Sequence, residues 1–280
     1  MAARKHRINE ERLEFIAEIL SGLGLHRILM LEEEDPQYTS VGRVWRAQGT
    51  GPTAVLAVLN ALVSYRLAMR GEDWWDCWAD YHSRNRYEAR LAVLASAELG
   101  FLENCRGSIV QKEAKKRRVK LATQNCRDTL ETLLLKPKLL RESGLWLVRG
   151  LARGLKAREN AKTIVFSAKM AYYALRQEEG RVPAPRDVDI PVDVRVACFL
   201  YSTGIVDAET YRDLVRSPAT AQKAVRLISQ QTGIPPLNLD TVFWLSGWTP
   251  RDLSLEEANV YIHRLLGLRG VSPIFVKRCI

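Results

Sequence analysis

The chain has few residues from which a metal site or a disulfide framework could be built. Its 280 residues include four histidines and five cysteines, and the cysteines are Cys77, Cys105, Cys126, Cys198 and Cys279. No two cysteines form a Cys-x-x-Cys pair, and the histidines show no metal-ligand spacing, which excludes a four-cysteine iron–sulfur loop. We therefore expect no metal, no cofactor and no disulfides, as in a reduced intracellular protein.

Long apolar segments are also missing. The most apolar segment, Ala54 to Val63, is too short to span a bilayer and is soon followed by Arg66. No signal peptide is visible. We expect a cytoplasmic monomer that does not contact a membrane.

Alternating segments of strand length, repeats and low-complexity linkers are absent as well. Apolar residues instead recur every three to four positions, which indicates helices. Asp35 and Pro36 are expected to be the N-cap and first position of one helix, and Pro52 opens another that runs through Leu67 to a stop at Gly71. Further helices are expected at approximately 74–98, 107–134, 144–152, 161–177, 193–203, 207–214, 218–231, 238–246 and 254–267. The fold class is therefore all-α, with enough residues for one large core or two lobes.

Basic residues outnumber acidic ones by 42 to 32, which gives a net charge of +10 and favours an anionic partner. Six of them fall in one decapeptide: Lys112, Lys115, Lys116, Arg117, Arg118 and Lys120. This basic segment is either a solvated helix face or a phosphate-binding surface. The second alternative predicts an affinity that falls steeply with salt.

The helix that begins near Lys162 has two different stripes. Ile164, Ala168, Ala171 and Leu175 share one apolar face at helical spacing. The opposite stripe, roughly 200° away, holds Lys162, Phe166, Lys169 and Tyr173. Either this is a surface helix with two solvated lysines, or the second stripe lines a cleft.

A proline-rich loop follows, from Arg181 to Val192, and ends at Asp193, which lies 31 residues after Lys162. Asp193 is expected to cap the next helix, because its carboxylate can accept the free N–H groups of the first turn. A lysine on a helix after a hairpin, then such a loop ending in aspartate, is how one superfamily of DNA glycosylases builds its active site.

Over roughly residues 10 to 250 the chain resembles the archaeal GO glycosylases, the 8-oxoguanine DNA glycosylase/AP lyases of the helix–hairpin–helix superfamily. The resemblance rests on six separated segments in the family's order: Asp35-Pro36-Gln37-Tyr38, Leu59 to Leu67, Gly71 to Trp75, Lys162 to Phe166, Ile190 to Asp193, and Gly233 to Leu237 running on to Asp240 and Trp244. It implies two helical subdomains with the active site in the cleft between them. Residues 1–280 would form a single catalytic unit. The hairpin, loop and aspartate would occupy approximately 145–205, and the N- and C-terminal helices would complete the second subdomain.

The resemblance also implies a role for each site residue. Lys162 is similar to the nucleophile that forms a Schiff base with the sugar, and Asp193 to the essential aspartate. Phe166 and Trp75 would sandwich the flipped base. Base-edge contacts would come from Gln37, Lys169, Asp240 and Trp244, with Ser64 and Pro191 at the margin of the pocket. The hairpin departs from the superfamily, since Ala152 to Ala161 contains no Leu-Pro-Gly-x-Gly turn.

These residue types suit the implied reaction. Base excision takes the base out of the stack, and aromatic stacking and edge hydrogen bonds compensate for the cost of flipping. Gln37 could accept a hydrogen bond from N7–H, which distinguishes 8-oxoguanine from guanine. A lysine nucleophile must be neutral, and we expect Lys162 to lose its proton in a closed pocket with Lys169 two turns along the helix.

The expected function is excision of 8-oxoguanine from damaged DNA, with strand cleavage by β-elimination. Three alternatives remain: a glycosylase for another damaged base, a non-catalytic helix–hairpin–helix DNA-binding protein, and a helical scaffold that never meets DNA. A binding module needs a hairpin and a basic surface, but not a lysine and an aspartate in register. Both Lys162 and Asp193 are present.

Overall fold

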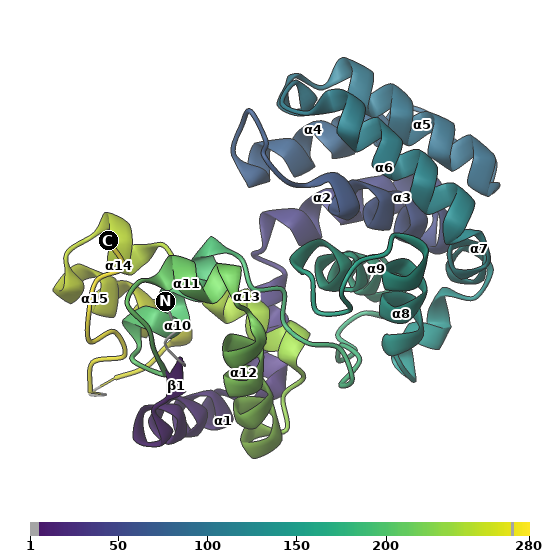
Figure 1. Ribbon diagram of the computed structural model, residues 1–280. Helices are drawn as coiled ribbons and strands as arrows, with labels where there is room; N and C mark the ends of the chain where they lie inside the picture. The colour runs from purple at the N-terminus through teal and green to yellow at the C-terminus, as the bar shows by residue number, and fades with distance from the viewer. Residues whose placement is uncertain (1–5, 270–271) are drawn as a thin grey trace. The chain divides into compact units, whose positions relative to one another are not determined.

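The computed structural model describes residues 6–269 and 272–280, whose regular structure is helical apart from two short strands (Figure 1), so the prediction of an all-α fold is confirmed. The chain divides into two compact units. One is continuous, from Glu32 to Val188. The other joins the segment that ends at Leu31 to the segment that begins at Asp189.

The continuous unit is built around two buried helices, α3 and α9. Its elements are α2 (Pro36–Gln48), α3 (Thr50–Val63), α4 (Gly71–Ser83), α5 (Leu91–Asn104), the 3-10 turn η1 (Arg106–Ser108), α6 (Lys112–Asn125), α7 (Arg127–Leu135), the 3-10 turn η2 (Pro137–Arg141), α8 (Leu145–Gly154) and α9 (Lys162–Glu179). Helix α3 is buried on all sides from Thr53 to Val63. A helix that is apolar all round belongs in a core, and α3 packs most extensively on α9.

Helix α9 is itself buried on more than its apolar stripe. Ile164 and Leu175 lie in the core as expected, but Lys169 and Tyr173 on the opposite stripe are buried too. The alternative of a surface helix with two solvated lysines is therefore wrong for Lys169. Only the first residue of the second stripe is exposed.

The second unit contains the helices at both ends of the chain. Its elements are β1 (Arg7–Ile8), α1 (Glu10–Glu32, whose last residue lies across the unit boundary), α10 (Val194–Ser202), β2 (Val206–Asp207), α11 (Tyr211–Arg216), α12 (Ala219–Thr232), α13 (Pro236–Ser246), α14 (Thr249–Asp252) and α15 (Leu255–Leu266). The two short strands pair antiparallel. In the core, the Phe199 ring stacks on Phe243 at 4.3 Å and meets Phe275 edge-on at 5.6 Å.

Several helix boundaries differ from the expected ones. The helix expected at 74–98 is split into α4 and α5, and that at 107–134 into α6 and α7. Helix α3 ends at Val63 rather than Leu67, and Gly71 begins α4 instead of stopping α3. The loop after α4 is held by Gln48 of α2, whose side chain accepts from the N–H of Tyr87 at 3.0 Å and donates to the carbonyl of His82 at 2.7 Å. These hydrogen bonds join residues far apart in the sequence, so the local pattern of apolar residues could not predict where α4 ends.

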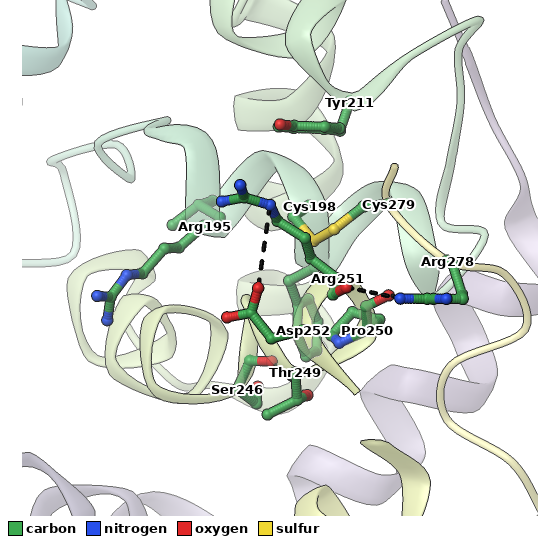
Figure 2. The surroundings of a disulfide bond; sticks show 12 residues. Arg195, Cys198, Tyr211, Ser246, Thr249, Pro250, Arg251, Asp252, Arg278 and Cys279 are labelled. Atoms are coloured by element: carbon green, nitrogen blue, oxygen red, sulfur yellow. Dashed lines mark hydrogen bonds and ion pairs between the residues drawn. A yellow bond between two sulfur atoms is a disulfide. The ribbon is translucent and has the colours of Figure 1, made fainter. Parts of the chain in front are cut away.

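The expectation of no disulfides is wrong for one pair. Cys198 of α10 is bonded to Cys279, with Cα atoms 5.5 Å apart (Figure 2). The two residues are separated by 81 positions, so no local sequence motif predicts the bond. The bond fastens the last residues of the chain to α10, where the N–H groups of Val276 and Lys277 also donate to the carbonyl of Ser202. The free thiols are Cys77, Cys105 and Cys126.

We predict that the Cys198–Cys279 bond contributes about 4 kcal/mol to the free energy of unfolding, because it closes a long loop in the unfolded chain. Thermal unfolding of the wild type with and without tris(2-carboxyethyl)phosphine measures this. The reductant should lower the Tm of the wild type and of a Cys126→Ala control. It should leave the Cys198→Ser/Cys279→Ser double variant unchanged. An unaltered wild-type Tm, with reduction verified by alkylation, would contradict the prediction.

Candidate active site

The connection between α8 and α9 is a short hairpin closed by backbone hydrogen bonds. The N–H of Ala157 donates to the carbonyl of Ala152 at 2.8 Å, and that of Ala161 to Arg158 at 3.0 Å. Lys156 takes a left-handed conformation, with φ of 50°, at the bend. The chain thus forms a helix–hairpin–helix without the superfamily's glycine-rich turn.

The hairpin delivers Lys162 as the first residue of α9. The preceding residue, Ala161, is extended and supplies no side-chain cap. The Lys162 side chain is exposed, whereas the sequence led us to expect a closed pocket. The buried helix fixes the backbone of Lys162, while the side-chain amine extends into solvent.

Arg118 contacts the start of α9, and the sequence did not predict this contact. Its guanidinium donates to the hydroxyl of Thr163, the residue after Lys162, at 3.0 Å. Burial lowers the pKa of Arg118. The sequence assigned the neighbouring cation to Lys169, but an arginine from α6 is the one that contacts the start of α9. A separation of 45 residues conceals this contact in the sequence.

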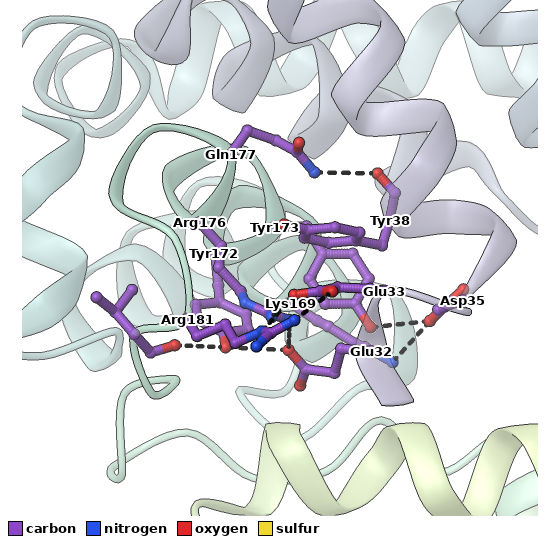
Figure 3. Close-up of polar contacts among 11 residues, drawn as sticks. Glu32, Glu33, Asp35, Tyr38, Lys169, Tyr172, Tyr173, Arg176, Gln177 and Arg181 are labelled. Carbon is purple, nitrogen blue, oxygen red and sulfur yellow. Dashed lines mark hydrogen bonds and ion pairs between the residues drawn. The ribbon is translucent and has the colours of Figure 1, made fainter. Parts of the chain in front are cut away.

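Lys169 is buried and paired with a carboxylate (Figure 3). Its ammonium lies 3.6 Å from Oδ2 of Asp35 and 5.1 Å from the centre of the Tyr173 ring. Seven residues along a helix correspond to about 10 Å, so Lys169 is closer to Asp35 than to the start of α9. Its charge is thus balanced by the carboxylate of Asp35.

Gln37 lies in the first turn of α2 and is only 5% exposed. Asp35 caps this helix as expected, with Oδ1 accepting from the N–H of Gln37 at 2.8 Å. The side-chain amide of Gln37 forms no hydrogen bond to residues 6–269 or 272–280. Most glutamines in a first turn are solvated, so a largely buried glutamine whose amide is left unused by its own protein is the more informative finding.

The predicted aromatic pair is in contact but not parallel. The Trp75 ring of α4 and the Phe166 ring of α9 have centroids 5.9 Å apart and planes at 82°. Trp75 also packs edge-on against Trp78 at 5.1 Å. A stacked base adds about 3.4 Å on each face, so a sandwich needs parallel rings about 7 Å apart. In this arrangement the two rings are too close and too steeply inclined to sandwich a base.

Ser64 sits at the C-terminal end of α3, where its hydroxyl donates to the carbonyl of Asn60 at 2.8 Å. The same oxygen accepts from the indole N–H of Trp74 at 3.1 Å. Trp74 is the neighbour of Trp75 on α4, so Ser64 ties the end of α3 to the helix that carries the predicted stacking residue.

Asp193 and Pro191 belong to the second unit. Pro191 is buried, and Asp193 is half-buried at the N-terminus of α10. Oδ1 of Asp193 accepts from the N–H groups of Arg195 at 2.9 Å and Val196 at 3.0 Å, so the predicted cap is confirmed. The other carboxylate oxygen has no hydrogen bond to any residue that the structure describes.

Asp240 and Trp244 lie one turn apart on α13 in the same unit, and both are buried. The guanidinium of Arg195 stacks over the Trp244 ring at 4.0 Å, a contact the sequence did not predict. Gly247 permits this arrangement, because a Cβ there would lie 2.3 Å from the carbonyl oxygen of Arg195. Helix α10, which Asp193 caps, therefore packs directly on the end of α13.

Within residues 6–269 and 272–280, no cluster of three or more histidine, cysteine, aspartate or glutamate side chains could hold a metal ion. None of the helices in the same ranges is long and apolar enough to cross a membrane.

Known proteins resemble this chain over most of its length. The family model described as AGOG, N-glycosylase/DNA lyase, matches residues 17–269. An N-glycosylase/DNA lyase of Aeropyrum pernix is 41% identical over 263 residues, which cover 93% of this chain and 91% of that protein. One from Pyrobaculum aerophilum is 36% identical over 240 residues, with coverage of 85% and 87%.

A solved structure agrees with these relatives. It is the crystal structure of an 8-oxoguanine DNA glycosylase from Pyrobaculum aerophilum, described as complexed with 8-oxoguanosine. The match has a TM-score of 0.74 and 31% identity, and covers 94% of this chain and 98% of that one. With a helix–hairpin–helix that presents a lysine, and relatives that match nearly end to end, the chain belongs to the AGOG family of N-glycosylase/DNA lyases.

Proposed function

We propose that this glycosylase/lyase removes 8-oxoguanine from DNA through a Schiff base on Lys162. The observation that carries the proposal is the exposed Lys162 amine at the first residue of α9, immediately after the hairpin. The substrate is suggested by the Pyrobaculum aerophilum relative, which is described as binding 8-oxoguanosine. A single chain would perform both steps, since the residues for both belong to one sequence. We propose that it acts in the cytoplasm.

In the first step the neutral Nζ of Lys162 attacks C1′ of the damaged nucleotide. The electrons of the glycosidic bond leave with the base, which takes up a proton. Opening of the sugar ring gives a protonated imine that acidifies the C2′ proton. Loss of that proton expels the 3′ phosphate and cuts the strand. The Arg118 guanidinium, which donates to the Thr163 hydroxyl, places a second cation at the start of α9.

Asp193 would stabilise the positive charge that develops on the sugar. Its two oxygens suit two tasks. One caps α10 and so fixes the side chain, and the other makes no hydrogen bond to the described residues. Because one oxygen is held by the helix, the other is already oriented to stabilise a positive charge.

Recognition of the base would use the buried polar residues. Gln37 offers its unused amide to N7–H, with further edge contacts from Lys169, Asp240 and Trp244 and with Ser64 and Pro191 at the margin. Trp75 and Phe166 would have to turn from their edge-on contact to admit a base between them. The energy of stacking, about 1–3 kcal/mol per base, would replace that of the aromatic contact they give up.

The basic segment supplies fewer phosphate contacts than its sequence suggests. Lys112 and Lys116 pair with Glu103, and Lys115 is buried beneath Tyr65 and Trp74. Arg118 is used at Thr163. This leaves Arg117 and Lys120 as exposed cations of α6. We propose that these two contact phosphates.

We predict that Lys162→Gln abolishes borohydride trapping on a labelled duplex containing one 8-oxoguanine, while the affinity for that duplex is retained. The reason is that glutamine cannot form an imine but leaves the surface nearly unchanged. Lys156→Gln, which removes an exposed lysine of the same hairpin, is the matched control and should trap like the wild type. An adduct in the Lys162 variant would exclude Lys162 as the nucleophile. A wild type that traps other lesions but not this one would exclude the substrate.

We predict that Asp193→Asn keeps the Tm of the wild type but slows base release at least about a hundredfold, because asparagine caps a helix as well as aspartate does yet carries no charge. Asp193→Ala should be equally slow and also less stable by about 1 kcal/mol. Single-turnover base release and thermal unfolding give both quantities. If the Asp193→Asn enzyme released the base at the wild-type rate, Asp193 would have only the structural role of a helix cap.

We predict that Arg117→Ala/Lys120→Ala makes the dependence of log Kd on log salt shallower by about 2, since each phosphate contact contributes about 0.9 to that slope. Lys112→Ala/Lys116→Ala removes the same charge from the same helix but from side chains already paired with Glu103. It should leave the slope within about half a unit of the wild type. Equal changes in the two variants would indicate a general charge effect rather than phosphate contact.

A further inference from the structure

One buried carboxylate links two residues expected to read the base. Asp35 is fully buried, in the turn that leads from α1 to α2. Its Oδ1 accepts from the backbone N–H of Gln37 at 2.8 Å. Its Oδ2 accepts from the hydroxyl of Tyr173 at 2.8 Å and lies 3.6 Å from the ammonium of Lys169 (Figure 3).

These contacts leave Asp35 little freedom. A hydrogen bond at each oxygen fixes the plane of the carboxylate, and the two donors come from different helices, α2 and α9. A buried ammonium is costly unless an opposite charge and hydrogen bonds compensate for the lost water. Fixing Asp35 therefore fixes the place where the charge of Lys169 is stable.

The same carboxylate fixes the backbone position of Gln37. The N–H that Asp35 accepts belongs to the first turn of α2, so the backbone of Gln37 is tied to the side chain that faces Lys169. The Gln37 side chain has no hydrogen bond of its own to the described residues. Its direction thus depends on the cap and on the packing around it.

We propose that Asp35 is a positioning residue for damage recognition, which sets the relative placement of Gln37 and Lys169 without touching the base. This rests on the proposed function, in which both residues contact the base edge. Discrimination between similar bases requires polar groups that do not move to suit the wrong one. A carboxylate that joins the two readers enforces that rigidity.

The alternative is an ion pair that only stabilises the fold. The two roles differ in what they affect, because an abasic site has no base edge to read. A stabilising pair influences base excision and cleavage at an abasic site alike, through the fraction of folded enzyme. A positioning residue influences excision alone.

The test uses Asp35→Asn in the full chain, with single-turnover rates on two duplexes, one containing 8-oxoguanine and one a preformed abasic site. Asparagine retains an oxygen for the N–H of Gln37 and remains a good cap, but removes the charge opposite Lys169. We expect excision to fall about tenfold or more, and abasic cleavage to stay within about twofold of the wild type. Glu33→Gln, in the same turn but paired with Arg176 and Arg181, is the matched control and should be normal on both.

Two further variants make the result decisive. Tyr173→Phe removes one hydroxyl from the network and should lower excision in the same selective way, by a smaller factor, even if Asp35→Asn folds poorly. Asp35→Asn/Lys169→Gln should be no worse on 8-oxoguanine than the poorer single variant, because Asp35 acts through Lys169.

Equal losses on both duplexes, unchanged ratios of the two rates, or strictly additive losses in the double variant would each overturn the proposal. Failure of the proposed function looks different. In that case the wild type itself would cleave the abasic duplex and leave 8-oxoguanine in place.

Discussion

The burial of α9 is the constraint on which the continuous unit depends. Lys169 and Arg176 project from the same helix into a dry interior, and each must find an opposite charge there. Asp35 serves Lys169, and Glu32 serves Arg176, at 2.5 Å from its guanidinium. Both carboxylates come from the four residues that enter α2. Removing one partner of a buried pair typically costs about 3–5 kcal/mol, so this entry segment and α9 are held in one register.

Because the ion pairs set this register, replacing them with apolar side chains would lose the alignment of the entry segment with α9. Buried ion pairs are often no more stabilising than well-packed hydrocarbon, and their value lies in directional geometry. In this unit Oδ2 of Asp35 receives both a tyrosine hydroxyl and a lysine ammonium, while Oδ1 sets the first turn of α2. Hydrocarbon at the same positions would fill the space but would not specify where Gln37 and Lys169 point. The base recognition proposed for Gln37 and Lys169 depends on that specification.

The sequence predicted what is local and missed what joins distant segments. The all-α class, the helix that begins at Lys162, the cap at Asp193 and the cap at Asp35 all follow from spacing and residue type within one turn or one helix. The partners of those residues do not. Asp35 and Tyr173 are 138 residues apart, Arg118 and Thr163 are 45 apart, and the Cys198–Cys279 bond spans 81. The same limitation explains the basic segment, where Lys115 belongs to the interior although its neighbours in sequence are solvated.

The two ends of α9 divide its chemistry between them. At the N-terminal end the Lys162 side chain is exposed, which suits the imine chemistry proposed for it. Two turns later Lys169 is buried and paired with Asp35, which suits the fixed position proposed for it in base recognition. The helix between them is rigid because it is buried against α3. Under the proposed function, a rigid helix with one exposed amine and one buried amine would keep the covalent step separate from recognition of the base.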